Sequence, residues 1–127
     1  MEIDAKHKVL FALYAEYQKD LPDMPAVTFE VLDMDSRVYK VSLLKLQNEG
    51  LIDGLITFPP GTRMEPKSVT LDSVLLTRYG INYVEDKLEI MEATTGVQKL
   101  KQLGEKFGRF GWEVLQKWVL LKLSQIV

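Results

Sequence analysis

Cysteine is absent from this sequence of 127 residues, and histidine occurs once, as His7. Without thiols the chain can form neither a disulfide nor a thiolate zinc site, and it has no cysteine nucleophile. His7 lies between two lysines on a predicted helix, where we expect a surface or half-buried position and no catalytic role. The sequence therefore predicts a protein that is not an enzyme and that holds no metal or cofactor.

Long apolar runs are also missing. No stretch of about 18 uncharged apolar residues exists, and a transmembrane helix needs roughly that length. The first 20 residues carry acidic residues ahead of the apolar segment and charges within it, unlike a signal peptide. Together with the lack of cysteine, these features predict a cytoplasmic protein without a membrane span.

A strong excess of one charge is lacking, because the formal net charge is −2. The charges are unevenly distributed along the chain, however. Residues 1–92 contain 10 Lys+Arg and 16 Asp+Glu, whereas residues 93–127 contain 6 and 2. This is the reverse of the simplest DNA-binding layout, in which the reading module itself is basic. We expect one domain over residues 1–92, followed by a helical segment at 93–127 that serves for dimerisation or docking.

The spacing of apolar residues predicts helices over residues 4–19, 28–32, 36–49 and 78–92. Each has a side chain that can cap its first turn: Asp4, Thr28, Asp35 or Ser36, and Thr77. Gly50 is the expected end of the third helix, because the left-handed position after a helix favours glycine. In the fourth helix, the acidic pair Glu85 and Asp86 is expected on the solvated face.

Two strands are predicted between the third and fourth helices, over residues 51–58 and 68–76. The stretch that joins them, "PPGTRMEPK", is rich in turn-forming residues and has no helical or strand periodicity. Further helices are expected over residues 97–108 and 110–126. The predicted fold class is therefore mainly α with a small β-hairpin.

Two segments resemble a known architecture: "LLKLQNEGLI" at 43–52 and "LLTRYGINYVED" at 75–86. The first resembles the end of a recognition helix that turns into a wing strand, and the second resembles the start of the helix after the wing. The order of elements is that of a winged helix-turn-helix followed by C-terminal helices. Over residues 4–92 the chain resembles the YjcQ-like family, small proteins of Gram-positive bacteria and their phages. The resemblance implies the fold and carries no assigned chemistry.

The third helix has two kinds of residue on its outward face if it docks as in DNA-binding winged helices. Tyr39, Leu43 and Leu46 then face the core. The outward residues are Arg37, Lys40 and Lys45, which are basic, and Val38, Val41 and Leu44, which are apolar.

The basic set, with Arg63 and Lys67 of the hairpin loop, suits phosphates and guanine edges of duplex DNA, as in a bacterial or phage transcription regulator. The apolar set is more typical of a protein contact. The alternative is therefore a winged-helix module that binds a protein and no DNA.

The last predicted helix is apolar over two arcs, so more than one of its sides is expected to be buried. Its protein-contact candidates are Trp112, Trp118 and Leu121. We expect one face to pack on the chain's own domain and another to form a homodimer. Burial wholly within one chain and adsorption to a membrane surface are the alternatives.

Overall fold

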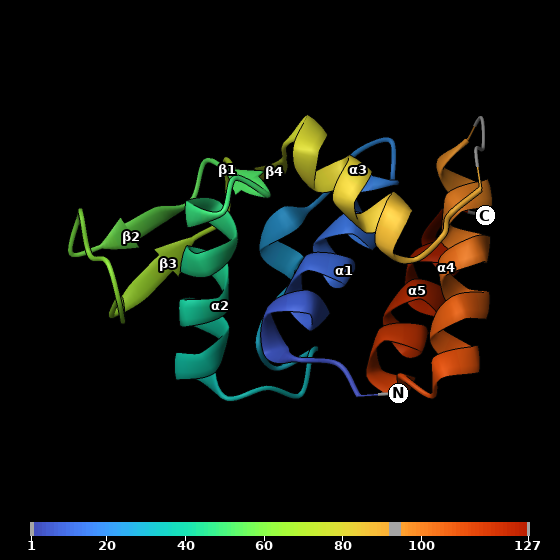
Figure 1. Ribbon diagram of the computed structural model, residues 1–127, viewed down its shortest axis with the longest axis horizontal. Helices are drawn as coiled ribbons and strands as arrows, with labels where there is room; N and C mark the ends of the chain where they lie inside the picture. Colours follow the sequence, from blue (N-terminus) through green and yellow to red (C-terminus); the bar gives the residue numbers. More distant parts are fainter. Residues whose placement is uncertain (1, 92–94, 127) are drawn as a thin grey trace.

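The computed structural model describes residues 2–91 and 95–126 and is mainly helical, with two short antiparallel strand pairs. In chain order the elements are α1 (Ala5–Tyr17), the 3₁₀ helix η1 (Met24–Ala26), α2 (Ser36–Asn48), β1 (Ile52–Asp53), β2 (Ile56–Phe58), β3 (Ser68–Thr70), β4 (Leu75–Leu76), α3 (Arg78–Lys87), α4 (Gly96–Phe110) and α5 (Glu113–Ile126). Helix α1 lies in the middle, with α2 and the strands β2 and β3 at one end of the molecule and α4 and α5 at the other (Figure 1).

Helix α1 is the centre of the core. Asp4 caps its first turn by accepting a hydrogen bond from the backbone N–H of His7 at 2.8 Å, as predicted. Every residue from Val9 to Glu16 is buried. This helix therefore has no solvated side along this stretch, because α2, α3 and α5 all pack around it.

The predicted helix at residues 28–32 was wrong. These residues form a turn, in which the Thr28 hydroxyl accepts from the Val31 N–H at 3.3 Å and the Met34 N–H donates to the Phe29 carbonyl at 3.0 Å. Asp33 has a φ of 51° and ends the turn. So short a segment gains too few hydrogen bonds to continue as a helix. The preceding connection contains η1 instead.

Helix α2 begins and ends where the sequence predicts. Asp35 is the cap and accepts from the N–H groups of Arg37 and Val38 at 2.8 and 3.1 Å. At the other end, Gly50 has a φ of 77°, and the Leu51 N–H reaches back to the Leu46 carbonyl at 2.9 Å. The predicted inner residues, Tyr39, Leu43 and Leu46, are buried.

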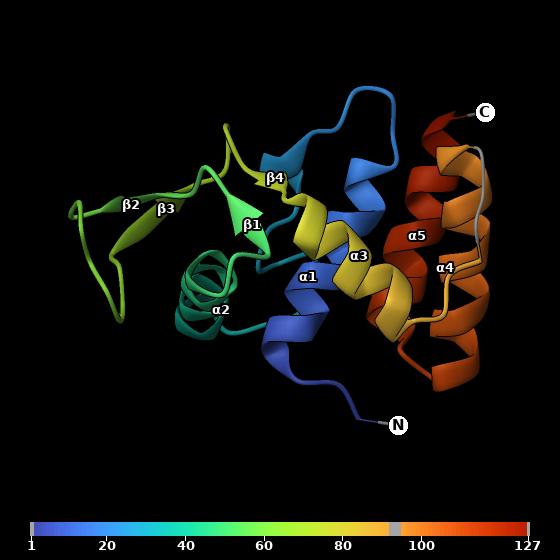
Figure 2. The same cartoon turned by 45° about the horizontal axis from the view of Figure 1, so that its top comes forward.

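Each of the two predicted strands is interrupted. Ile52 pairs with Leu76 in the β1–β4 pair, and Ile56 pairs with Thr70 in the β2–β3 pair. Gly54 separates β1 from β2 with a φ of 86°, and a Cβ there would lie 2.0 Å from the Ser73 carbonyl oxygen. Strands β2 and β3 with their connection, residues 59–67, are called the hairpin below. The hairpin projects from the body beside α2 (Figure 2).

Helix α3 starts as predicted and ends earlier. Thr77 accepts from the Gly80 N–H at 2.9 Å. Gly80 lies so close to β1 that a Cβ would come 2.0 Å from the Leu51 carbonyl oxygen. The helix ends at Lys87, and Glu89 follows with a φ of 53°, so the predicted continuation fails before residue 92, which lies outside the described residues.

Helices α4 and α5 pack on each other, and α5 packs on α1. Phe107 of α4 stacks on Phe11 of α1. Gly111, with a φ of 75°, ends α4 and lets the chain turn into α5. The Trp118 indole N–H donates to the Ala12 carbonyl at 3.1 Å, so α5 shares the core of α1. The predicted domain boundary at 92/93 lies outside the described residues. No helix formed by the described part of the chain is long and apolar enough to span a bilayer.

Candidate functional site

The side of α2 that faces away from α1 carries all six residues predicted to point outward. Arg37, Val38 and Lys45 are exposed, and Lys40, Val41 and Leu44 are half-buried. This exposed side of α2 together with the hairpin is called the α2 face. It is the part of the structure that brings together the residues predicted to bind DNA.

The hairpin is fastened along one flank of α2 by polar contacts. The Arg37 guanidinium, near the start of α2, forms a two-contact ion pair with Glu65 in the hairpin connection. The Lys40 ammonium donates to the Lys67 carbonyl at 2.7 Å. Near the end of α2, the Gln47 side chain accepts from the Leu55 N–H at 2.7 Å. The position of the hairpin is therefore set by contacts that the linear sequence does not reveal.

These contacts distinguish the cations of the α2 face from one another. Arg37 lowers the pKa of Glu65, so the carboxylate stays ionised and offsets the guanidinium charge. Lys40 donates to the uncharged Lys67 carbonyl, and its positive charge also helps to lower the pKa of Glu65. Lys45 and Arg63 are exposed.

Two grooves flank the outer side of α2. The larger, about 950 Å³, lies between α2 and the hairpin and is lined on its apolar walls by Val41, Leu44, Ile56 and Met64. The second, about 690 Å³, lies between α2 and the start of α1. Val41 and Lys45 line both grooves, so α2 separates the groove beside the hairpin from the groove beside α1.

The α2 face is the positive part of residues 1–92, which are otherwise acidic. Residues 36–70 contain five Lys+Arg and three Asp+Glu, whereas residues 1–35 contain three and eight. All five cations predicted to bind DNA fall in the first of these segments. Positive charge therefore collects at this end of the molecule, and α4 and α5 at the other end are also basic, since residues 93–127 contain six Lys+Arg and two Asp+Glu.

Comparison of the chain with family models, curated proteins and solved structures found no match.

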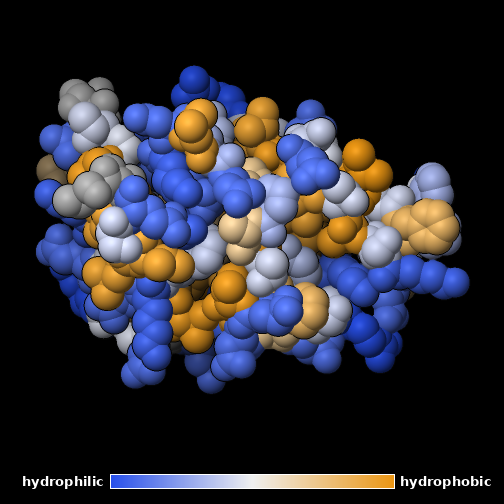
Figure 3. All heavy atoms as spheres, turned by 180° about the vertical axis from the view of Figure 1, so that it is seen from behind, coloured by the Kyte–Doolittle hydropathy of each residue, from blue (hydrophilic) through white to orange (hydrophobic). Residues whose placement is uncertain are grey.

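The three residues of the C-terminal segment that were predicted to contact a partner differ in how far they are buried. Trp118 is 5% exposed and bonded to α1, so its prediction as a partner contact was wrong. Trp112 is half-buried and stacks on Phe11 and Phe110. Leu121 is 48% exposed, and its neighbour Leu120 is 55% exposed. In the view from behind, hydrophobic residues reach the surface among hydrophilic ones over these helices (Figure 3).

Sequence reasoning missed a buried ion cluster between α1 and α5. Glu16 and Lys122 are both buried, and the Lys122 ammonium lies 3.0 Å from Glu16 Oε1. Glu16 Oε2 accepts from the Asp23 N–H at 2.8 Å and lies 3.2 Å from the Lys19 ammonium. Burial opposes ionisation of Glu16, but these partners outweigh it and lower the pKa of its carboxyl. The Lys122 ammonium also lies 3.9 Å from the centre of the Trp118 ring.

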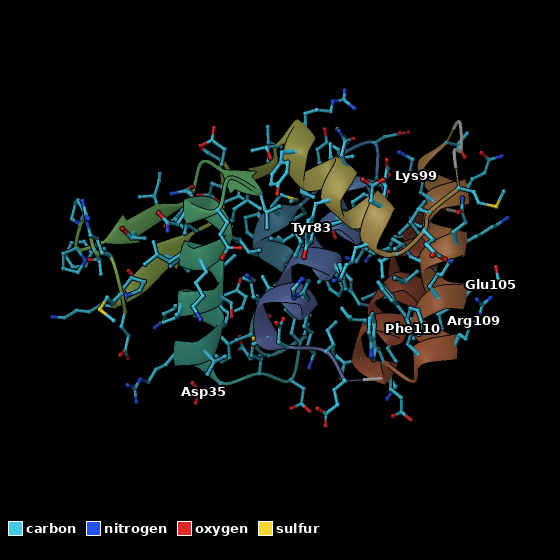
Figure 4. The ribbon with its side chains drawn as sticks, in the orientation of Figure 1. Asp35, Tyr83, Lys99, Glu105, Arg109 and Phe110 are labelled. Atoms are coloured by element: carbon cyan, nitrogen blue, oxygen red, sulfur yellow. The ribbon has the colours of Figure 1, made fainter. Side chains whose placement is uncertain are left out.

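A second polar cluster joins three helices. Glu85 of α3 accepts from the buried Tyr14 hydroxyl and from Lys99, both at 2.7 Å. Lys99 lies near the start of α4 (Figure 4). The predicted solvated position of Glu85 was wrong, because α4 packs close enough to pair with it. Burial and the neighbouring Glu85 carboxylate raise the pKa of Tyr14. The cluster ties α1, α3 and α4 together and lies away from the α2 face.

His7 is half-buried, in agreement with its expected position. Its two ring nitrogens hydrogen-bond to the Asp4 carboxylate at 2.7 Å and to the Tyr83 hydroxyl at 2.6 Å. The contact with Tyr83 holds the start of α1 against α3. Within residues 2–91 and 95–126, no group of three or more acidic or histidine side chains is arranged to bind a metal ion.

Proposed function

We propose that this protein is a winged helix-turn-helix protein that binds duplex DNA through the α2 face. The observation that carries the proposal is the gathering of Arg37, Lys40, Lys45, Arg63 and Lys67 on α2 and the hairpin, within residues 1–92, which are otherwise acidic. The order α1, α2, hairpin, α3 supports the winged-helix assignment, with α2 as the recognition helix and the hairpin as the wing. Membership of the YjcQ-like family and a role in transcription regulation remain part of the proposal.

In this mechanism α2 enters the major groove, which is wide enough to admit a helix. Lys45 and Lys40 contact phosphates or base edges, and Arg63 and Lys67 contact the flanking backbone. Arg37 has its charge offset by Glu65, so it contributes less to phosphate binding than Lys45 does. Phosphate contacts of this kind give binding that weakens as salt is added, because counterions are released from DNA.

Charge reversal on α2 tests the proposal. Lys40→Glu/Lys45→Glu is expected to weaken binding to a genomic DNA pool for every sequence, and to reduce the slope of log affinity against log salt by about 2. Fluorescence anisotropy at several salt concentrations measures both quantities. The matched control is Lys101→Glu/Lys117→Glu, which changes the net charge equally at exposed positions on α4 and α5. Absence of wild-type binding at low salt, or an equal loss in the control, contradicts DNA binding by α2.

A protein-interaction module without DNA binding is the second candidate function. The observation that favours it is the apolar strip on the α2 face, where Val38 is exposed and Val41 and Leu44 are half-buried. DNA has few apolar groups to cover such a strip, since thymine methyls are the main ones in the major groove. If the folded wild-type protein binds no duplex DNA at low salt, protein interaction is the better-supported function.

We also propose that α5 forms a homodimer through Leu120 and Leu121, which are exposed although large and apolar. Leu120→Glu/Leu121→Glu is expected to give a monomer, because two carboxylates cannot be buried unpaired in an interface. Sedimentation velocity at micromolar concentration measures the mass, and Lys117→Glu on the same helix is the control. A wild-type protein that sediments as a monomer contradicts the dimer.

A further inference from the structure

The larger groove on the α2 face has the size of a binding site and is open to solvent. Its volume of about 950 Å³ lies at the upper end of the range for ligand pockets, roughly 300–1,000 Å³. Along α2 its lining extends from Val41 to Asn48, which is about two helical turns. The opposite wall consists of β2 and the hairpin connection. A groove of this length fits an elongated partner segment better than a compact small molecule.

The walls expose apolar side chains that duplex DNA does not account for. Met64 is 79% exposed, and Ile56 is more than half exposed. Both lie on the hairpin, across the groove from Val41 and Leu44. Exposed apolar groups that line one concavity typically mark a contact with protein. The backbone of duplex DNA presents phosphates and sugars to a wing, so it would leave these side chains without apolar partners.

The charges of the groove are of one sign. Lys45 lines it from α2 and Arg63 lines it from the hairpin, and no lining residue is acidic. The nearest hairpin carboxylate, Glu65, is paired with Arg37 and lines the other groove. Charge complementarity across an interface selects partners and speeds their association. The groove therefore favours a partner that combines apolar groups with carboxylates.

We propose that this groove docks an acidic amphipathic helix of a partner protein. The apolar side of the helix, with anchors spaced at i, i+3, i+4 and i+7, packs on Val41, Leu44, Ile56 and Met64, as in other helix-in-groove complexes. Its carboxylates lie beside Lys45 and Arg63. The docking site shares Lys45 and Arg63 with the proposed DNA contact but does not depend on DNA binding. A docked acidic helix competes with DNA for these two cations.

The test uses the whole chain and two designed peptides of about 15 residues, long enough to form a helix on binding. The acidic peptide has leucine or phenylalanine at the anchor positions and glutamate elsewhere, and the matched peptide has lysine in place of every glutamate. Fluorescence anisotropy of the labelled peptides measures affinity. We expect the acidic peptide to bind the wild type and the basic peptide not to bind.

Two pairs of variants locate the peptide. Met64→Ser is expected to weaken binding of the acidic peptide about tenfold, because few contacts carry most of the energy of an interface. Met91→Ser, at a methionine that is 76% exposed and outside the groove, is expected to have no effect. Arg63→Glu should weaken binding by about as much and reduce its salt dependence, because an attractive charge pair that salt screens is lost. Lys101→Glu on α4 should change neither.

The outcomes separate this proposal from the one on DNA. No binding of the acidic peptide, or equal binding by wild type, Met64→Ser and Arg63→Glu, overturns the docking site. Peptide binding that is lost in both variants, in a protein that binds no duplex, supports the docking site and contradicts the DNA function. If the wild type binds both the acidic peptide and duplex DNA, the peptide is expected to displace the DNA. Simultaneous binding of the two would place the peptide outside the groove and overturn the docking site.

Discussion

Replacing Lys122 by methionine is expected to destabilise the fold by about 3 kcal/mol, because removal of one partner leaves a buried charge uncompensated. Glu16 has no exposed surface, and Lys122 is its partner on α5. Lys19 and the Asp23 N–H remain as partners, so we expect the lower end of the range for broken buried pairs. Urea denaturation followed by circular dichroism measures the free energy of unfolding.

The double variant Glu16→Gln/Lys122→Met separates buried charge from lost packing. Glutamine keeps an acceptor for the Asp23 N–H and removes the carboxylate charge, so the double variant should recover at least half of the loss. Lys117→Met, at an exposed position on the same helix, should change stability by less than about 0.5 kcal/mol. A double variant as unstable as Lys122→Met would show that packing, and not charge, is responsible.

The stability difference should also depend on pH. The pKa of Glu16 is lowered in the folded wild type, so its contribution is present above the ordinary value of 4.5 and disappears as the pH falls through the lowered value. In Lys122→Met the carboxylate loses its main counter-charge, and protonation relieves the unpaired charge. The gap between wild type and variant should therefore be large at pH 7 and shrink below pH 4.5.

Replacing Gly80 by alanine is expected to lower stability by about 3 kcal/mol, at the upper end of the range for added atoms in a packed site. The new Cβ would lie 2.0 Å from the Leu51 carbonyl oxygen, which is backbone and cannot rotate away. Relief of the overlap requires α3 to separate from β1, where Thr77 also donates its hydroxyl to the Gly50 carbonyl. For a chain of this size the melting temperature should fall by roughly 10 °C.

Gly104→Ala is the matched control, since Gly104 also lies within a helix at an ordinary φ. A Cβ there would lie 3.5 Å from a Val119 side-chain carbon, which is ordinary contact. Alanine is favoured over glycine in a helix interior by about 1 kcal/mol, so this variant should keep or raise the melting temperature. Equal effects of the two substitutions would contradict the close approach of α3 to β1.

Local signals in the sequence predicted where most helices begin and end. Asp4, Asp35 and Thr77 cap their helices through side-chain oxygens that reach N–H groups within three residues. Such contacts depend on neighbouring residues alone, so the sequence contains them in full. The predicted helix at 28–32 failed for the same local reason, because it was too short to sustain itself and the left-handed Asp33 ends the turn.

The sequence predicted which residues of α2 lie on the α2 face, but it did not predict the groove beside them. Helical periodicity placed Tyr39, Leu43 and Leu46 inside, and all three are buried. Of the six predicted outward residues, three are exposed and three are half-buried. The groove beside them depends on the hairpin, whose contacts join Arg37 to Glu65 and Lys40 to Lys67 across 28 and 27 residues. Periodicity describes one helix at a time, so it cannot reveal which segment lies along its flank.

By itself the sequence determined the types of the elements, their caps and the inner side of α2, because these follow from interactions between residues close in the chain. Tertiary structure alone decided that α1 is buried on all sides, that Trp118 and Lys122 face inward, and that Glu85 meets Tyr14 and Lys99. From the sequence alone, a lysine is expected to be exposed to solvent. Lys122 is buried because the buried Glu16 carboxylate lies opposite it. That carboxylate is 106 residues away in the chain, and only folding brings it within 3.0 Å.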